Sequence, residues 1–204
     1  ISEIKRASPS AGHIAEIGDP LEMAKLYVEL GAAAISVLTD AGFNGSMADL
    51  RRVTEGLKDS PIPVLCKDFM LTPPQIAEAA ANGADVILLI VHVLKEKTLE
   101  MAKLAHAFGL EVLVEVHNPN ELEIALQANV DVIGVNQRDL NDFTMHPDQF
   151  AELIRLIPTG VVKVAESGLK TREQALAAIE LGYDGVLVGE ALSRLANPAE
   201  FFGA

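Results

Sequence analysis

The sequence predicts an α/β fold of one particular kind, a (β/α)8 TIM barrel. Short β-branched runs alternate with longer helical stretches from one end of the chain to the other, which is typical of parallel strands joined by crossover helices. Eight such pairs can be counted, and similar short strings recur at intervals of two units. Eight units in 204 residues is close to the compact limit for a barrel.

The individual elements follow from local signals. Helix starts are indicated where a turn or capping residue precedes a proline suited to the first turn, at Asp19-Pro20, Thr72-Pro73, Asn118-Pro119 and His146-Pro147. Helix ends are indicated by glycines that can adopt a left-handed conformation, namely Gly31, Gly83, Gly109 and Gly182. The strands are expected at residues 1–5, 34–38, 64–67, 86–90, 111–116, 132–135, 161–165 and 185–188.

The repeat and the absence of linkers predict one domain. Similar strings begin at Gly31, Gly83, Asn129 and Gly182, each between a helix and an even-numbered strand. No stretch rich in proline, serine or charge separates two halves, so residues 1–204 are expected to form a single barrel domain. The rival architecture is an open doubly wound sheet, but no GxGxxG turn follows the first strand, and we favour the barrel.

Charge and cysteine content restrict the partners. The net charge of −13 would repel nucleic acid and anionic lipid, so neither is an expected partner, and an anionic small substrate would need a local basic pocket. The single cysteine, Cys66, precludes an internal disulfide and predicts a reducing cytoplasmic location. No apolar run reaches the ~20 residues that span a bilayer. The sequence opens at Ile1 in a strand-like pattern without a signal peptide, which indicates a trimmed front.

Charged residues at strand ends are the candidates for chemistry, because barrel active sites lie at the carboxyl ends of the strands. Glu3 and Lys5 are two positions apart and therefore face the same side of the first strand, either the barrel interior or solvent. Lys67 ends a buried strand; it can polarise a carbonyl oxygen with a pKa lowered by burial, or it can pair with Asp68. Glu115 interrupts an apolar strand and can act as a base or stabilise positive charge.

Further candidates follow strands six, seven and eight. Asn136 can orient a substrate hydroxyl, whereas Arg138 is interpreted as bracing its loop by pairing with Asp139. A phosphate site is expected at the loops that contain Glu166-Ser167-Gly168 and Gly189-Glu190, assisted by Arg6, Ser8 and Ser10 after strand one. Ordinary turns are the alternative interpretation of both loops.

The remaining reactive residue types predict no further site. The histidines lack metal-ligand spacing and are expected in loops or on helix surfaces, so no metal is predicted; they are His13, His92, His106, His117 and His146. Cys66 should point away from Lys67, as a small buried hydrophobic residue.

Taken together, the strand-end motifs resemble those of the indole-3-glycerol phosphate synthase family. The resemblance covers nearly the whole chain in the right order, and EIKRASPS and LCKDF are its most specific motifs. The matching segments are EIKRASPS at 3–10, SVLT at 36–39, LCKDF at 65–69, GAD at 83–85, LLI at 88–90, VEVH at 114–117, IGVN at 133–136, RDL at 138–140, ESG at 166–168 and VGE at 188–190.

The resemblance implies an enzyme of tryptophan biosynthesis. It would close the indole ring of 1-(2-carboxyphenylamino)-1-deoxyribulose 5-phosphate with loss of carbon dioxide and water, and without a cofactor. On the family pattern Lys67 would be the general acid on the carbonyl, Glu115 would stabilise charge or move protons, and Glu3 and Lys5 would assist the dehydration. Asn136 and Ser167 would orient the substrate. The remaining contacts would come from Lys5, Ser8, Phe69, Leu88, Arg138, Glu166, Gly168, Gly189 and Glu190.

The sequence also departs from the family pattern. The family carries an extra helix before the first strand that helps to cover the substrate, and this sequence begins at that strand. Gln137 stands where a second Asn is usual, the loop at 40–45 is slightly short, and the last helix ends early at 202–204.

Two alternative functions follow. One is another phosphosugar barrel, such as phosphoribosylanthranilate isomerase, which the charged residues of strands one and three argue against. The other is a trimmed barrel that binds phosphate but does not catalyse. A monomer is expected, and association with other enzymes of the tryptophan pathway is a further expectation.

Overall fold

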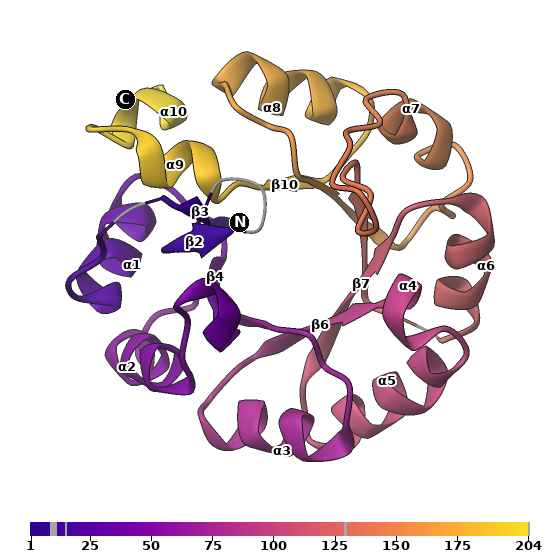
Figure 1. Cartoon of the computed structure of the whole chain (residues 1–204), viewed down its shortest axis with the longest axis horizontal. Helices are drawn as coiled ribbons and strands as arrows, with labels where there is room; N and C mark the ends of the chain where they lie inside the picture. The colour runs from indigo at the N-terminus through magenta and orange to yellow at the C-terminus, as the bar shows by residue number, and fades with distance from the viewer. Residues whose placement is uncertain (9–11, 15, 129, 204) are drawn as a thin grey trace.

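A computed structural model describes residues 1–8, 12–14, 16–128 and 130–203, with Ser8 described only as part of a strand. Ser10 and Asn129, which the sequence analysis names, and the terminal residue Ala204 lie outside the described residues. Figure 1 looks down a ring of strands that is surrounded by helices. The predicted (β/α)8 barrel is therefore confirmed.

Eight parallel strands form the sheet, in the order in which they occur along the chain. The first and last strands approach each other. The N–H of Glu3 donates to the carbonyl oxygen of Val188 at 2.9 Å, and the N–H of Val188 donates to the carbonyl oxygen of Ile1 at 3.0 Å. These bonds nearly close the barrel. The strands are β1 (Ser2–Ile4), β4 (Ile35–Leu38), β5 (Val64–Lys67), β6 (Val86–Ile90), β7 (Glu111–Val116), β8 (Val132–Asn136), β9 (Val162–Glu166) and β10 (Gly185–Leu187).

The strand predictions agree with the structure to within one or two residues at each end. Local capping explains why most helix starts were also predicted correctly. The Asp19 side chain accepts from the N–H of Leu21 at 2.9 Å, and Thr72 forms a capping box with Gln75. The helices are α1 (Pro20–Glu29), η1 (Ala41–Phe43), α2 (Met47–Leu57), α3 (Pro73–Ala81), α4 (Val91–Leu94), α5 (Lys97–Ala107), α6 (Pro119–Gln127), α7 (Gln149–Leu153), α8 (Arg172–Glu180), α9 (Glu190–Arg194) and α10 (Ala199–Phe202).

The predicted helix ends are confirmed, but one predicted start is wrong. All four glycines expected to follow helices have positive φ, at Gly31, Gly83, Gly109 and Gly182. The helix expected at His146-Pro147 begins only at Gln149. The backbone N–H of His146 donates to the oxygen of Gln137 at 2.8 Å, which holds His146 in the loop before α7.

Short elements in the connections were not predicted. A small antiparallel hairpin of β2 (Ala7–Ser8) and β3 (Gly12–His13) follows β1. The helices η1 and α4 were missed as well, and the expected last helix is divided into α9 and α10. Elements of two to four residues are too short to display a periodic pattern, so sequence periodicity could not reveal them.

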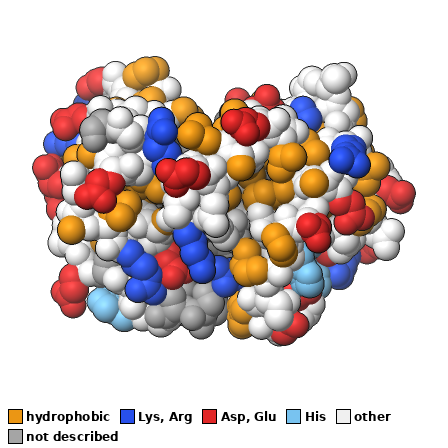
Figure 2. All heavy atoms as spheres, turned by 90° about the horizontal axis from the view of Figure 1, so that it is seen from above, with side chains coloured by type: hydrophobic (Ala, Val, Ile, Leu, Met, Phe, Trp, Pro, Cys, Tyr) orange, Lys and Arg blue, Asp and Glu red, His pale blue; other side chains and the backbone are white. Residues whose placement is uncertain are grey.

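The apolar side chains divide between two regions. The larger region lies between strands and helices and includes Cys66, which is fully buried as predicted. The smaller region comes from alternate strand positions and fills the barrel, with Leu65, Leu88, Ile90, Leu113, Val164 and Leu187. Within the described part of the chain, no helix is both long and apolar enough to cross a bilayer. Figure 2 shows acidic, basic and hydrophobic side chains intermingled on one side of the molecule.

Candidate active site

A cavity of about 570 Å³ lies at the carboxyl ends of the strands. Every predicted site residue with a described side chain lines it apart from Arg6, whose Nη1 instead lies 2.6 Å from Asp49 Oδ2, so the structure brings together residues spread from the first strand to the last. These residues are Glu3, Lys5, Lys67, Phe69, Leu88, Glu115, Asn136, Arg138, Glu166, Ser167, Gly168, Gly189 and Glu190.

The first strand contributes a buried carboxylate between two lysines. Glu3 is only 2% exposed, which excludes the solvent-facing alternative for this residue. Its Oε1 lies 3.3 Å from Lys5 Nζ, and its Oε2 lies 3.5 Å from Lys67 Nζ. Burial alone would raise the pKa of Glu3, but the two lysines hold it below its ordinary value. Glu3 is therefore an ionised group that ties both lysines to the cavity.

Lys67 lines the cavity, and the alternative interpretation, an ion pair with Asp68, is excluded. The Asp68 carboxylate accepts from Thr39 Oγ1 at 2.7 Å, whereas Lys67 pairs with Glu3. Its pKa was expected to be lowered by burial. Burial does act in that direction, but the nearby carboxylates of Glu3, Glu166 and Glu115 raise the pKa of Lys67 above its ordinary value. Lys67 is therefore a cation that can donate a proton or a hydrogen bond.

Two further carboxyls are buried beside this lysine. Glu115 and Glu166 are each 1% exposed, and Oε1 of each has no hydrogen-bond partner. Burial and the neighbouring Glu115 raise the pKa of Glu166 well above its ordinary value. Sequence reasoning assigned Glu166 only a binding role, because nothing local to its strand indicated that Glu115 would lie close to it.

Two glycines make room for the buried carboxyls. A Cβ at Gly134 would press on Glu166 Oε1, and a Cβ at Gly189 would press on Glu3 Oε1. In the sheet Gly134 is paired with Glu115, so β8 leaves space between the carboxyls of the strands on either side. Glycine is therefore required at both positions so that a carboxyl can lie against the backbone, and at Gly189 this requirement is separate from the predicted phosphate role.

The loop after β8 is braced differently from the prediction. Asn136 Oδ1 accepts from the N–H of Arg138 at 2.9 Å. The carboxylate of Asp139 accepts from the backbone N–H of Asn141 at 2.6 Å. The expected pair between Arg138 and Asp139 does not occur among the ion pairs of the described residues, and Arg138 instead lines the cavity. Arg138 is therefore available to an anionic ligand.

The two loops predicted to bind phosphate have unusual backbone geometry. Ser167 and Gly168 follow β9 with consecutive positive φ angles of 66° and 73°. A positive φ is uncommon for a residue other than glycine and is found preferentially at functional sites. Gly189 directly precedes α9. The cavity also includes Lys170 and Arg194, cations that the sequence analysis missed because each follows its strand end by several residues.

An aromatic wall completes the cavity. Phe69 was predicted from the family motif, and Phe43 from η1 lies beside it with ring centroids 6.3 Å apart. Phe43 was not identified as a site residue, since it is in a loop with no local signal of its own. The two rings supply an apolar surface on which a planar ring can pack.

Four of the histidines lie in loops or on helices as expected, whereas His13 lies in β3. His117 differs in being nearly buried, and its Nδ1 lies 3.0 Å from Glu121 Oε2. His92 lies 3.1 Å from the same carboxyl group, measured from Nδ1 to Oε1. No group of three or more potential ligands suited to a metal ion occurs among the described residues.

This barrel, with ionisable groups and a deep cavity at the carboxyl ends of its strands, has the arrangement of the (β/α)8 barrel enzymes. Comparison with known proteins identifies the family within this class of enzymes. The family model described as indole-3-glycerol phosphate synthase matches residues 1–203, and the chain belongs to that family. The family is a carbon–carbon lyase of tryptophan biosynthesis, as the sequence motifs implied.

Individual relatives agree with this family. The chain is 48% identical to an indole-3-glycerol phosphate synthase of Exiguobacterium sibiricum, covering 100% of this chain and 79% of the relative. It is 47% identical to one of Mycolicibacterium gilvum, covering 97% and 72%. A solved thiamine phosphate pyrophosphorylase of Pyrococcus furiosus superimposes with a TM-score of 0.72 at 16% identity, covering 98% of this chain and 89% of that one. At that identity the likeness concerns the fold alone.

Proposed function

We propose that the cavity performs the family's ring closure with Lys67 as the general acid. The aromatic carbon that carries the substrate carboxylate attacks the carbonyl carbon, and the carbonyl oxygen takes a proton from Lys67 Nζ. Loss of carbon dioxide then restores the aromatic ring, and departure of the new hydroxyl as water completes the indole. The observation that carries this proposal is that Lys67 lines the cavity as a cation, with a pKa raised by three carboxyls.

The other buried groups divide the remaining steps. Glu115 stabilises the positive charge that develops on the substrate nitrogen as the ring closes. Glu3 and Lys5, which contact each other at 3.3 Å, assist the dehydration by exchanging protons with the departing hydroxyl and the ring carbon. We assign Glu166 the role of a hydrogen-bond donor to the substrate, because its raised pKa favours a protonated carboxyl.

The substrate's two anionic groups have cations to receive them. The phosphate is assigned to the loops after β9 and β10, with Gly168, Gly189 and the nearby Lys170 and Arg194. The carboxylate is assigned to Arg138 and Lys5, which also line the cavity. The arrangement supports the earlier inference that an acidic protein needs a local basic pocket for such a ligand.

Several broader predictions remain part of this proposal. The family match over residues 1–203 supports one domain, and the intermingled charges on the face shown in Figure 2 support a monomer without a nucleic-acid or membrane partner. A cytoplasmic location, and association with other enzymes of the pathway, are also proposed on the basis of the family. Light scattering of the purified chain, alone and with the neighbouring pathway enzymes, tests the monomer and the association.

The function is tested by indole fluorescence. The purified chain is mixed with 1-(2-carboxyphenylamino)-1-deoxyribulose 5-phosphate beside Lys67→Ala and a matched control, Lys25→Ala. Lys25 pairs with Glu22 on the surface of α1, so its removal should leave turnover at the wild-type level. Loss of general acid catalysis should lower kcat of Lys67→Ala by about 10²–10⁴-fold.

The outcomes separate the alternatives. Turnover that is abolished only in Lys67→Ala supports the proposed role of this lysine. A wild-type chain that is folded and binds indole-3-glycerol phosphate, but forms no indole product, would instead indicate a phosphate-binding barrel without catalysis. Equal turnover of Lys67→Ala and the control would contradict the assignment of the general acid.

A further inference from the structure

A second cavity lies outside the barrel, next to the carboxyl end of β7. It measures about 540 Å³ and is separated from the active-site cavity by a thin wall of side chains. Leu140 lines both cavities, Glu115 lines the active site, and His117 lines the second cavity. Glu115 and His117 are therefore the two faces of this wall.

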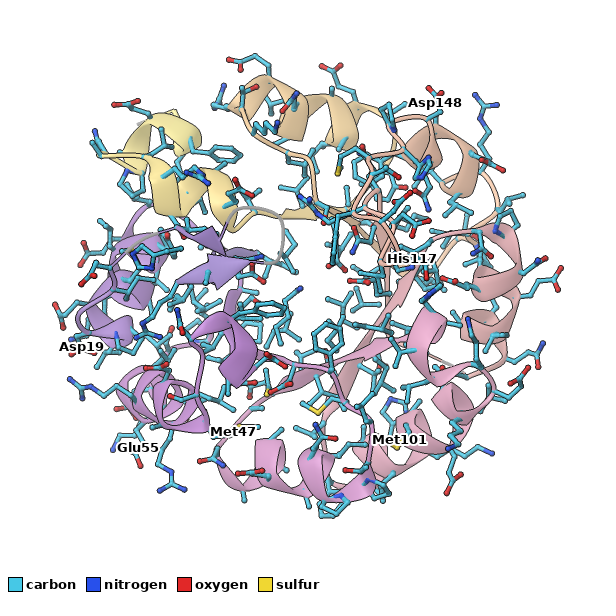
Figure 3. All side chains as sticks on the ribbon, viewed as in Figure 1. Asp19, Met47, Glu55, Met101, His117 and Asp148 are labelled. Carbon is cyan, nitrogen blue, oxygen red and sulfur yellow. The ribbon has the colours of Figure 1, made fainter. Side chains whose placement is uncertain are left out.

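A continuous series of contacts crosses the wall. Glu115 Oε1 lies 3.4 Å from His117 Nε2, and His117 Nδ1 lies 3.0 Å from Glu121 Oε2. The same Glu121 oxygen accepts from the backbone N–H of His117 at 2.8 Å, and the other lies 3.1 Å from His92 Nδ1. Figure 3 shows His117 between the barrel strands and helices α4 and α6.

Local structure explains why these groups meet. His117 directly follows β7, two positions beyond Glu115, and its imidazole reaches back to the Glu115 carboxylate. The chain then turns into α6, where Asn118 Oδ1 accepts from the N–H of Glu121 at 3.0 Å. This cap fixes the first turn of α6 and so places the Glu121 carboxylate under the imidazole ring.

The contact between Glu115 and His117 is incomplete. Both Glu115 Oε1 and His117 Nε2 are buried and have no hydrogen-bond partner, although they face each other. Buried polar atoms without a partner are rare in folded proteins, and hydrogen bonds in an empty active site are often long and shorten when substrate binds. The separation of 3.4 Å is therefore suited to a bond that forms in the occupied site.

The surrounding charges favour an imidazolium. Burial lowers the pKa of His117, but Glu121, Glu115 and Asp139 raise it above its ordinary value. His92 from α4 packs against the ring, with centroids 5.8 Å apart. Among the described residues, His146, Asp148 and Glu152 also line the second cavity, from the loop before α7 and from α7 itself. The acidic groups outnumber the basic ones around His117.

We propose that His117 is a positioning residue that holds the Glu115 carboxylate for ring closure, and that Glu121 in turn orients His117. This inference rests on the proposed function. His117 does not line the active-site cavity, so its removal should misplace Glu115 without removing a substrate contact. The effect should therefore fall on kcat and leave KM nearly unchanged.

The test is His117→Ala with chemical rescue. Misplacement of a catalytic group by about 1 Å can cost as much as 10²-fold, so kcat should fall by about 10- to 100-fold. Because the second cavity adjoins the vacated space, added imidazole should restore kcat. Pyrazole has the same shape but is not protonated near neutral pH, and it should restore nothing. The matched control is His106→Ala, which removes a histidine that pairs with Asp131 on the surface.

Each result decides the question. A fall in kcat of His117→Ala that imidazole alone reverses supports the proposal. An unchanged kcat, a change in KM alone, rescue by both azoles or rescue by neither overturns it. Should His117→Ala fail to fold, Glu121→Gln takes its place, and a wild-type kcat in that variant also overturns the proposal. Absence of indole product from the wild-type chain would refute the proposed function itself, and is read in the same experiment.

Discussion

Gly134→Ala tests whether the buried carboxyls are packed as tightly as the structure indicates. The added Cβ would overlap Glu166 Oε1 and would lie 3.0 Å from the carboxyl carbon of Glu166 and 3.2 Å from Leu113 Cδ1. The Glu166 side chain is 1% exposed, so it can move only toward the active-site cavity. The substitution should therefore displace a group of the active site as well as strain the barrel.

A matched variant isolates the size of the effect. Gly185→Ala also adds a Cβ in a strand, β10, but that Cβ meets no atom within 4 Å. Both variants gain a similar stabilisation from the lower entropy of the unfolded chain, so this contribution cancels in the comparison. Overpacking costs about 1–3 kcal/mol, which for a chain of this size corresponds to a Tm roughly 2–12 °C lower for Gly134→Ala than for Gly185→Ala.

Calorimetry and the fluorescence assay measure the two consequences. Gly134→Ala should show the lower Tm and a kcat reduced by up to about 10²-fold, since the displaced carboxyl no longer lies where the substrate requires it. Gly185→Ala should retain the wild-type kcat. Equal Tm and equal kcat for the two variants would refute the packing argument, because they would mean that the carboxyl has room to move without consequence.

Three further predictions concern separate parts of the chain. Burial would raise the pKa of Glu121, but His117 lowers it from 4.5 to about 2, so its stabilising contribution is present above pH 4.5 and is lost as the pH falls toward 2. The gap in urea midpoint between wild type and Glu121→Gln should close over that interval, and a constant gap would contradict the shift. Burial raises the pKa of the Cys66 thiol to about 12, so a thiol reagent at neutral pH should label the chain only in denaturant, and rapid native labelling would argue against it. Thr171→Ala removes the capping box formed with Gln174 and should cost about 0.5–2 kcal/mol in chemical denaturation, with kcat unchanged; no loss would show that the cap is dispensable.

Local sequence patterns determined most of the fold. Strand runs, proline-linked helix starts and terminal glycines depend on interactions within a few residues, and these are available from the sequence directly. Thr72 with Gln75 and Gly31 with its positive φ are examples in which the local signal and the structure agree. Where a long-range contact competed, as in the bond from His146 to Gln137, the local signal for a helix start was wrong.

The position of the candidate site was also determined by sequence, through strand ends and family motifs, but its electrostatics were not. Lys67 is followed directly by Asp68 in the chain, yet it pairs with Glu3 of β1, although β4 lies between β1 and β5 in the sheet. The pKa of Lys67 rises rather than falls because carboxyls from β1, β7 and β9 converge on it. Coulombic interactions depend on distances between side chains, and only closure of the barrel sets those distances.

The wall between the two cavities also depends on both local sequence and tertiary packing. The sequence placed Glu115 and His117 two residues apart, which determined that they would lie close together. It did not reveal that α6 would bring Glu121 against the far side of the imidazole, or that a cavity would lie behind it. Identity and local direction are properties of the chain, whereas burial and charge environment arise only when β7, α4 and α6 pack together and exclude water.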